Sequence, residues 1–208
     1  AIRCYFEDNG YLEVETPVRI PAPAPEEHID AQSSGSWFLH TSPELCMKRL
    51  LAAGFERIFQ ICKCFRKGER GRLHLPEMTL LEWYTAGHDY RDMMRQCEDL
   101  IVSVALTTRH AKRIQYQGQG IDLTEPWQRM TVNEAFEKYA SVSLNTAIQN
   151  GTFDEIIGCD IAPNLGSEKP VFLFDYPAVL GSLARLKQED ESVAERFELY
   201  IAGIEICN

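Results

Sequence analysis

The stretch RIFQICKCFRKGERGRLHLPEMTLLEWYT, residues 57–85, decides the fold. Its two ends, 57–65 and 78–85, are apolar runs rich in residues that favour strands. Between them lies a charged loop that contains Gly68 and Gly71. Two such runs joined by a glycine-containing loop predict a long β-hairpin with a charged tip.

The loop of this hairpin, residues 66–76, gathers five basic side chains: Arg66, Lys67, Arg70, Arg72 and His74. A guanidinium group offers a planar fork of donors to phosphate oxygens, so the loop fits a polyphosphate. Most charged loops are solvated hairpin tips, and the residues alone leave both interpretations open.

The elements outside the hairpin alternate between helical and strand patterns. We expect helices over 2–6, 43–51, 89–106 and 131–139, and strands over 11–15, 37–40, 170–176 and 196–207, with a polar loop over 26–36. The segment 107–169 is weakly patterned and is expected to be peripheral or inserted. The order predicts an α+β fold, an antiparallel sheet flanked by helices.

Composition indicates a soluble globular protein in one domain. The chain has 208 residues, of which 45% are hydrophobic and 25% charged. Its net charge of −10 disfavours non-specific binding to nucleic acids. No apolar run is long enough to cross a membrane, so we expect a cytoplasmic protein. The chain begins without Met inside a helical pattern, and we expect native residues to precede it.

The cysteines, seven in number and scattered, indicate reduced thiols. Cys62 and Cys64 alternate within an apolar run, so they are expected to share one face of a strand. A metal pair is possible there, but no second pair follows at zinc-site spacing. Buried structural thiols are the favoured interpretation.

Three acidic residues interrupt apolar strands: Glu82 in LLEWY, and Glu198 and Glu205 in RFELYIAGIEICN. A carboxylate in such a strand must face solvent, a cation or a metal, because a buried unpaired charge is very costly. The odd spacing places Glu198 and Glu205 on opposite faces of one regular strand, unless Ala202 and Gly203 form a turn or bulge. On spacing alone, solvent-facing carboxylates are favoured.

Four ordered blocks of the sequence resemble a known family. GYLEVETP (10–17) resembles motif 1 of the class II aminoacyl-tRNA synthetases, and FRKGERGRLHLPEMTLLEWY (65–84) resembles their motif 2. TSPELCMKRLLAAGFERIFQI (41–61) and AERFELYIAGIEICN (194–208) resemble blocks of the lysyl branch. The resemblance spans nearly the whole chain and is weakest over 107–170. It implies a class II catalytic domain over 1–208 that joins an amino acid to ATP as an adenylate.

The resemblance also implies a role for each matching residue. Arg66 is the catalytic residue and holds the α-phosphate of ATP, Arg72 and His74 reach the outer phosphates, and Met78 covers adenine. Glu44 binds the α-ammonium of a lysine-like amino acid, Glu82 and Tyr84 line its side-chain pocket, and Asn208 touches its carboxylate. Glu198 and Glu205 coordinate Mg²⁺. Adenylate formation then needs positioning and electrostatics but no protein nucleophile.

The sequence departs from the family pattern at three points. Gly68 stands where motif 2 usually has Glu, with Glu69 one place later, and Met78 replaces an aromatic residue. The chain stops at Asn208, before motif 3, so we expect the domain to be truncated there.

Three hypotheses follow for the function. The first is a short lysyl-tRNA synthetase paralog that attaches lysine, by resemblance (R)-β-lysine, to elongation factor P. The motif 1 helix at the start, TSPE, and LPEMTLLEWY with Trp83 favour it. The second is a lysyl-tRNA synthetase that charges tRNA, and the third a synthetase-like regulatory binder without catalysis. The resemblance further implies a homodimer whose interface buries Ile2, Tyr5 and Phe6.

Overall fold

The computed structural model describes residues 1–25 and 29–208. The chain divides into two compact units, Ile2–Gly87 and His88–Asn208 with Ala1, and each is described by itself. Part of the polar loop expected over 26–36 lies outside the described residues. Among those described, no helix is long and apolar enough to cross a membrane.

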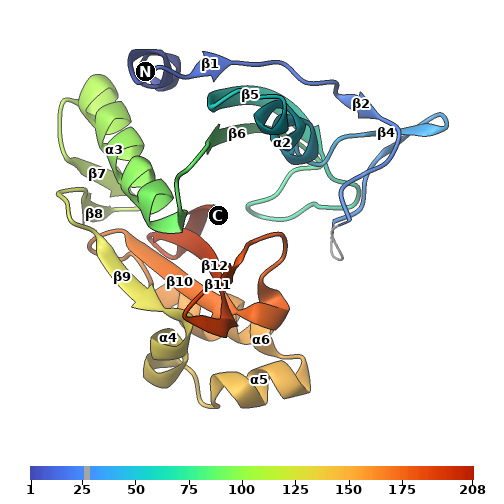
Figure 1. Ribbon diagram of the computed structural model, residues 1–208. Coiled ribbons are helices and arrows are strands. Elements are labelled where there is room, and N and C mark those ends of the chain that lie inside the picture. Colours follow the sequence, from blue (N-terminus) through green and yellow to red (C-terminus); the bar gives the residue numbers. More distant parts are fainter. Residues whose placement is uncertain (26–28) are drawn as a thin grey trace. The chain divides into compact units, whose positions relative to one another are not determined.

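The unit Ile2–Gly87 is built on the predicted hairpin. Strands β5 (Arg57–Phe65) and β6 (Glu77–Thr85) pair antiparallel over their whole length, and β1 (Leu12–Glu13) joins β5 in parallel (Figure 1). A second small sheet has the order β2 (Arg19–Ile20), β4 (Trp37–Leu39), β3 (Ser33–Ser34). The long hairpin is confirmed. The strand expected over 11–15 is wrong in extent, because only two of its residues pair.

Helices α1 (Ile2–Asp8) and α2 (Glu44–Ala52) complete this unit. Phe6 of α1 is buried and stacks on Phe59 with ring centroids 4.6 Å apart, so α1 is fixed to the hairpin. Before α2, the Glu44 N–H donates to Ser42 Oγ at 3.0 Å, and Pro43 occupies the N-cap position. We expected Pro43 inside the first turn, so the helix begins one residue later than predicted.

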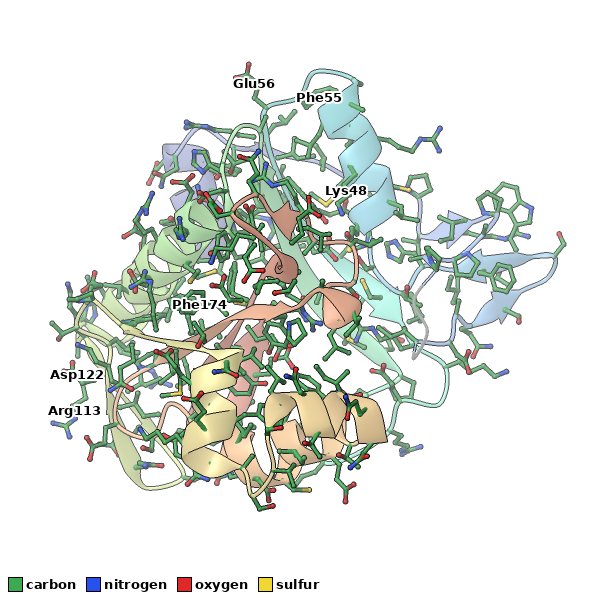
Figure 2. The ribbon with its side chains drawn as sticks, turned by 60° about the horizontal axis from the view of Figure 1, so that its bottom comes forward. Lys48, Phe55, Glu56, Arg113, Asp122 and Phe174 are labelled. Carbon is green, nitrogen blue, oxygen red and sulfur yellow. The ribbon has the colours of Figure 1, made fainter. Side chains whose placement is uncertain are left out.

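The unit His88–Asn208 contains a five-stranded sheet. Its order is β11 (Leu186–Lys187), β12 (Asp190–Ile201), β10 (Val171–Pro177), β9 (Gln128–Thr131), with β13 (Ile204–Cys207) paired to β12. Strands β10 and β12 are antiparallel, whereas β9 and β10 are parallel. The long helix α3 (Tyr90–Arg109) begins with an Asp89 capping box, and β7 (Arg113–Tyr116) and β8 (Gln119–Asp122) form a hairpin that is labelled at Arg113 and Asp122 in Figure 2.

The helices of this unit cover the sheet and make its core. They are α4 (Val132–Tyr139), α5 (Leu144–Asn150) and α6 (Phe153–Ile156), followed by a π-helical turn (Ile157–Ile161) and two 3-10 turns (Ala162–Asn164 and Ala178–Leu180). Phe136 and Ile161 pack with Leu173 and Tyr200 of the sheet in one buried cluster. The segment 107–169, expected to be peripheral or inserted, therefore supplies the β7–β8 hairpin, strand β9 of the sheet and much of the core. Because the helices and strands of this segment are short, its apolar residues show little regular spacing, and the sequence did not indicate that they form a core.

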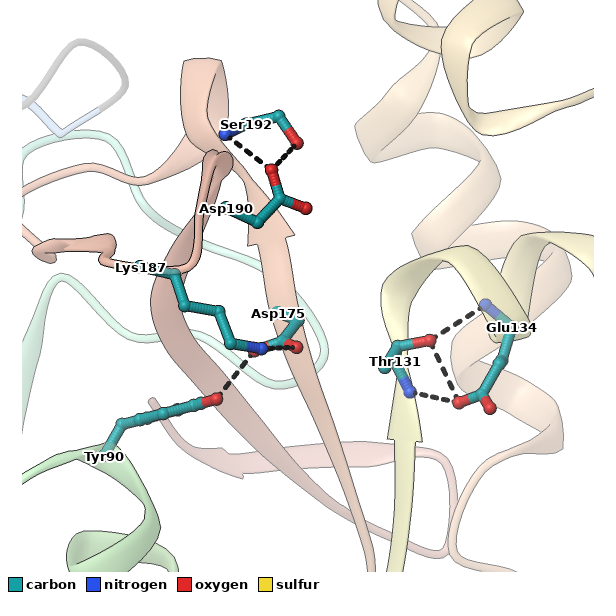
Figure 3. A network of polar contacts seen from close by, with 7 residues as sticks. All are labelled: Tyr90, Thr131, Glu134, Asp175, Lys187, Asp190 and Ser192. Atoms are coloured by element: carbon teal, nitrogen blue, oxygen red, sulfur yellow. Dashed lines mark hydrogen bonds and ion pairs between the residues drawn. The ribbon is translucent and has the colours of Figure 1, made fainter.

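Two groups of polar contacts stabilise the end of β9 and the bulge in β10 (Figure 3). Thr131 and Glu134, at the Thr-x-x-Glu spacing visible in the sequence, form a capping box at the start of α4. Asp175 has a positive φ of 59° at a bulge in β10 and accepts from the Tyr90 hydroxyl at 2.8 Å and from Lys187 Nζ at 2.5 Å. These bonds join α3 and β11 to the bulge in β10.

Candidate active site

One face of the β5–β6 hairpin carries the predicted amino-acid pocket. The register pairs Gln60 with Glu82, and every second residue along a strand projects to the same side. Met78, Glu82 and Tyr84 therefore share one face with the two cysteines of β5. Sequence spacing alone predicts that the three β6 residues share a face, because they are separated by even numbers. The cysteines lie on that face because of the register between β5 and β6.

Glu82 is the chemically distinctive group on this face. Its carboxylate accepts hydrogen bonds from the Ser42 hydroxyl and, at 2.9 Å, from the Tyr84 hydroxyl. Burial raises the pKa of Glu82, and the nearby Glu44 carboxylate adds to the rise. Both hydroxyl partners are neutral, so they stabilise the carboxylate by hydrogen bonds but do not balance its charge. The carboxylate can therefore bind a cation.

The Ser42 hydroxyl accepts from the Glu44 N–H and donates to the Glu82 carboxylate, so the structure brings these two predicted residues together. Glu44 stands at the start of α2 and forms an ion pair with Lys48 one turn later. Figure 2 shows Lys48 projecting from α2. A substrate ammonium at Glu44 would have to share the carboxylate with Lys48.

Arg66 stands where β5 ends and the loop begins. Its Nε lies 3.4 Å from the Thr41 carbonyl oxygen, and its Nη1 lies 3.6 Å from Glu69 Oε2. Charge-assisted bonds of this kind are usually about 2.7–2.9 Å long. The guanidinium is thus held in place without a short hydrogen bond to either group, and its donors can bind an anion. Glu69 makes the contact because Gly68, with a φ of 79°, lets the loop turn between them.

His74 lines a shallow hollow of about 310 Å³ together with Glu69, Arg70 and Gly71. The Gly71 N–H donates to the His74 carbonyl at 3.1 Å and tightens the loop. Arg72 is exposed between them. This donor set of guanidinium and imidazole groups fits the phosphates of a nucleotide.

Glu198, Glu205 and Asn208 belong to the other unit. Strand β12 turns into β13 at Ala202 and Gly203, whose φ values of 53° and 74° are those of a tight hairpin turn. Tyr200 pairs with Glu205, which places Glu205 on the same face as Tyr200 and Glu198. The turn at Ala202 and Gly203, which the sequence left as an open alternative, therefore exists. It places Glu198 and Glu205 on one face despite their odd spacing in sequence.

The expectation that Glu198 faces solvent is wrong. It is 6% exposed, and its two oxygens accept from Arg196 Nη2 and from the Tyr200 hydroxyl, each at 2.7 Å. Glu205 is exposed and accepts from Asn208 Nδ2 at 3.0 Å. Carboxylate oxygens on one face suit Mg²⁺, although Glu198 would share its oxygens with Arg196 and Tyr200.

Several residues of the site were not predicted as functional. Ser42, whose Oγ accepts from the Glu44 N–H, also donates to Glu82, forty residues further along the chain. Lys48 pairs with Glu44 at i,i+4 spacing, a signal visible in the sequence. Arg196 and Tyr200 flank Glu198 at two-residue spacing on one strand face, which was also visible.

The whole chain, residues 1–208, matches the model of the family tRNA synthetases class II (D, K and N). The chain belongs to this family. The resemblance found in the sequence is thereby confirmed, and membership implies the use of ATP. The matched segment covers the residues predicted to bind it.

Named bacterial relatives align with the full length of the chain. Proteins called elongation factor P--(R)-beta-lysine ligase are 36% identical in Pectobacterium atrosepticum, 38% in Hamiltonella defensa and 37% in Salmonella gallinarum. The alignments cover 100% of this chain and 69%, 68% and 68% of those proteins, respectively. The relatives are named as ligases, and this chain is an ATP-dependent ligase.

Proposed function

We propose that this protein activates lysine or (R)-β-lysine with ATP and transfers the aminoacyl group to a lysine side chain of elongation factor P. The observation that carries the proposal is the match of the entire chain to ligases named for that acceptor and that amino acid. We place the reaction in the cytoplasm, where a translation factor acts.

The amino-acid part of the proposal is supported by the paired acids of the hairpin face. A lysine-like substrate carries two ammonium groups. Glu82 has only hydroxyl partners among the described residues, so it suits the side-chain ammonium, with the Tyr84 hydroxyl beside it. Glu44 suits the second ammonium. Burial is the main cause of the raised pKa of Glu82, and repulsion from the Glu44 carboxylate raises that pKa further. A dication relieves that repulsion.

The ATP part is supported by Arg66 and the loop cations. The substrate carboxylate attacks the α-phosphorus in line, pyrophosphate leaves, and Arg66 stabilises the charge that develops on the α-phosphoryl oxygens. Arg72 and His74 hold the outer phosphates, Met78 covers adenine, and Asn208 orients the carboxylate of the amino acid. Glu198 and Glu205 would hold Mg²⁺, which draws charge onto the leaving pyrophosphate.

The activation step is tested by pyrophosphate exchange with a panel of amino acids. We expect exchange with lysine, (R)-β-lysine or both, and none with aspartate or asparagine, which the acidic pair repels or fails to hold. Exchange driven by aspartate in preference to both lysines would overturn the assigned pocket.

A second candidate is the charging of tRNA, because the family description covers synthetases of that kind. The net charge of −10 opposes it, since tRNA binding depends on basic residues that release counterions from phosphates. An acidic surface suits a basic, lysine-bearing protein loop better.

We also propose that the protein is a homodimer, as the class II resemblance implies. Of the three residues expected in the interface, Phe6 is already buried within its own unit, so a dimer contact there can use only Ile2 and Tyr5. Sedimentation at micromolar concentration tests this, and a monomer at all concentrations contradicts it.

A further inference from the structure

Beside the amino-acid pocket, three side chains converge that the proposed reaction does not use. They are His40, which follows β4, and Cys62 and Cys64 of β5. One ligand atom from each lies within 4.8 Å of the others. Within residues 1–25 and 29–208, no other His, Cys, Asp or Glu side chains gather so closely in a group of three.

The distances in the cluster are close to those of a tetrahedral thiolate site. The two sulfur atoms lie 3.8 Å apart, and Cys64 Sγ lies 3.9 Å from His40 Nε2. Zinc–sulfur bonds of about 2.3 Å and zinc–nitrogen bonds of about 2.0–2.1 Å give tetrahedral edges of roughly 3.8 Å between two sulfurs and 3.6 Å between sulfur and nitrogen. The sulfur pair already has the required spacing, and the distance from His40 Nε2 to Cys64 Sγ exceeds its tetrahedral edge by only a few tenths of an ångström.

The backbone holds all three residues in place. The His40 N–H donates to the Val18 carbonyl at 2.9 Å, and the Phe65 N–H donates to the His40 carbonyl at 3.0 Å. The cysteines lie in the fully paired hairpin, opposite Leu80 and Met78. Ligands on paired strands are positioned before a cation arrives, so little ordering opposes binding.

The surroundings favour a cation that prefers sulfur. His40 and Cys64 are buried, and Cys62 is partly exposed, which gives the cluster an entrance. His40 Nε2 contacts the Lys63 carbonyl at 2.7 Å, whereas Nδ1 has no hydrogen-bond partner among the described residues. Nδ1 can therefore take the ring proton when Nε2 becomes a ligand. The hydrogen bond from Cys64 and the neighbouring imidazole lower the pKa of Cys62, so one thiolate is readily available.

We propose that His40, Cys62 and Cys64 form a binding site for one thiophilic divalent cation, with Zn²⁺ as its simplest occupant. Each thiol that becomes a ligand loses its proton to solvent, and the imidazole binds in its neutral form. Two thiolates then balance the double charge of the cation. Water takes the fourth position through the side on which Cys62 is exposed.

Metal binding by the full protein tests the site without ATP or amino acid, so its outcome is separate from that of the proposed function. The protein is reduced, stripped with a chelator and titrated with Zn²⁺ at mildly alkaline pH, and bound metal is measured after gel filtration. Co²⁺ serves as a second probe, because thiolate ligands give it a charge-transfer absorption. We expect one metal ion per chain and a thiolate–cobalt band.

Substitutions assign the ligands. Cys62→Ser and His40→Gln should each weaken Zn²⁺ binding by at least about tenfold, a loss typical even of outer-shell changes at metal sites. Cys159→Ser, at an exposed cysteine, is the matched control and should bind as the wild type does. Thermal melting without metal shows whether each variant is folded, and Cys62 is the preferred target because it is only partly buried.

The sulfur atoms of Cys97 and Cys207, 3.7 Å apart, are the main competitor for a soft cation. If Cys207→Ser abolishes binding while Cys62→Ser leaves it unchanged, the proposed site is wrong. Absence of bound Zn²⁺ in the folded, reduced wild type overturns it equally.

Discussion

Glu82→Gln should weaken binding of the amino-acid substrate while the protein still folds. Gln keeps the shape of the side chain, and the hydroxyls of Ser42 and Tyr84 can still bond to it. What is lost is the charge offered to the substrate ammonium. A hydrogen bond to a charged group contributes about 1.5–3 kcal/mol, which corresponds to a roughly 10- to 150-fold rise in the KM for lysine. Steady-state pyrophosphate exchange at saturating ATP measures it.

The same substitution should stabilise the fold at neutral pH. Burial raises the folded-state pKa of Glu82 above the ordinary value of 4.5. A carboxyl with a raised folded pKa contributes most to stability below its unfolded pKa, and that contribution is lost as pH rises through the folded pKa. The melting temperature of Glu82→Gln should therefore exceed that of the wild type near pH 7, and the difference should shrink toward pH 4.5.

Glu77→Gln is the matched control for Glu82→Gln. Glu77 lies on the same strand with an odd separation from Glu82, so it is on the other face, and it is exposed beside Lys63 at 3.6 Å. It should change neither the KM for lysine nor the melting temperature appreciably. Equal KM values for the wild type and Glu82→Gln would refute the assignment of Glu82 to the substrate ammonium.

Three further substitutions and one control variant probe catalysis and folding. Arg66→Ala should slow adenylate formation at least about a hundredfold in pyrophosphate exchange and leave the circular dichroism unchanged, whereas Arg95→Ala, on the exposed side of α3, should keep normal exchange. Asp89→Ala removes the capping box of α3 and should lower the unfolding free energy by about 0.5–2 kcal/mol in urea titration. Phe136→Ala should lower it by about 3–5 kcal/mol, because the ring is 1% exposed and stacks on Phe153; a loss under about 1 kcal/mol would contradict the packing described.

The local elements with strong signals were predictable from the sequence. The hairpin of β5 and β6 follows from two apolar runs and a glycine-containing loop, and α4 from the Thr131–Glu134 capping box. The strand at 11–15 was overestimated, because alternation of residue types does not reveal how many of them find a partner. The core role of 107–169 was hidden because its helices are short and packing overrides weak local propensity.

The candidate site was predictable where spacing determines it. Even spacing places Glu82 and Tyr84 on one face, and a turn at Ala202 was an open alternative. The partners of these residues were not predictable, because contacts such as that of Ser42 with Glu82 join positions far apart in sequence. The burial of Glu198 depends likewise on how β12 packs, which residue spacing does not contain.

The acceptor assay tests the central claim most directly. The full-length protein, with ATP and Mg²⁺, is offered elongation factor P or lysine tRNA separately, with radiolabelled lysine and with labelled (R)-β-lysine, at identical salt. We predict label on elongation factor P that is lost when its acceptor lysine is replaced by arginine, and no appreciable label on tRNA. Efficient charging of tRNA with no label on the protein would contradict this account and identify a tRNA synthetase.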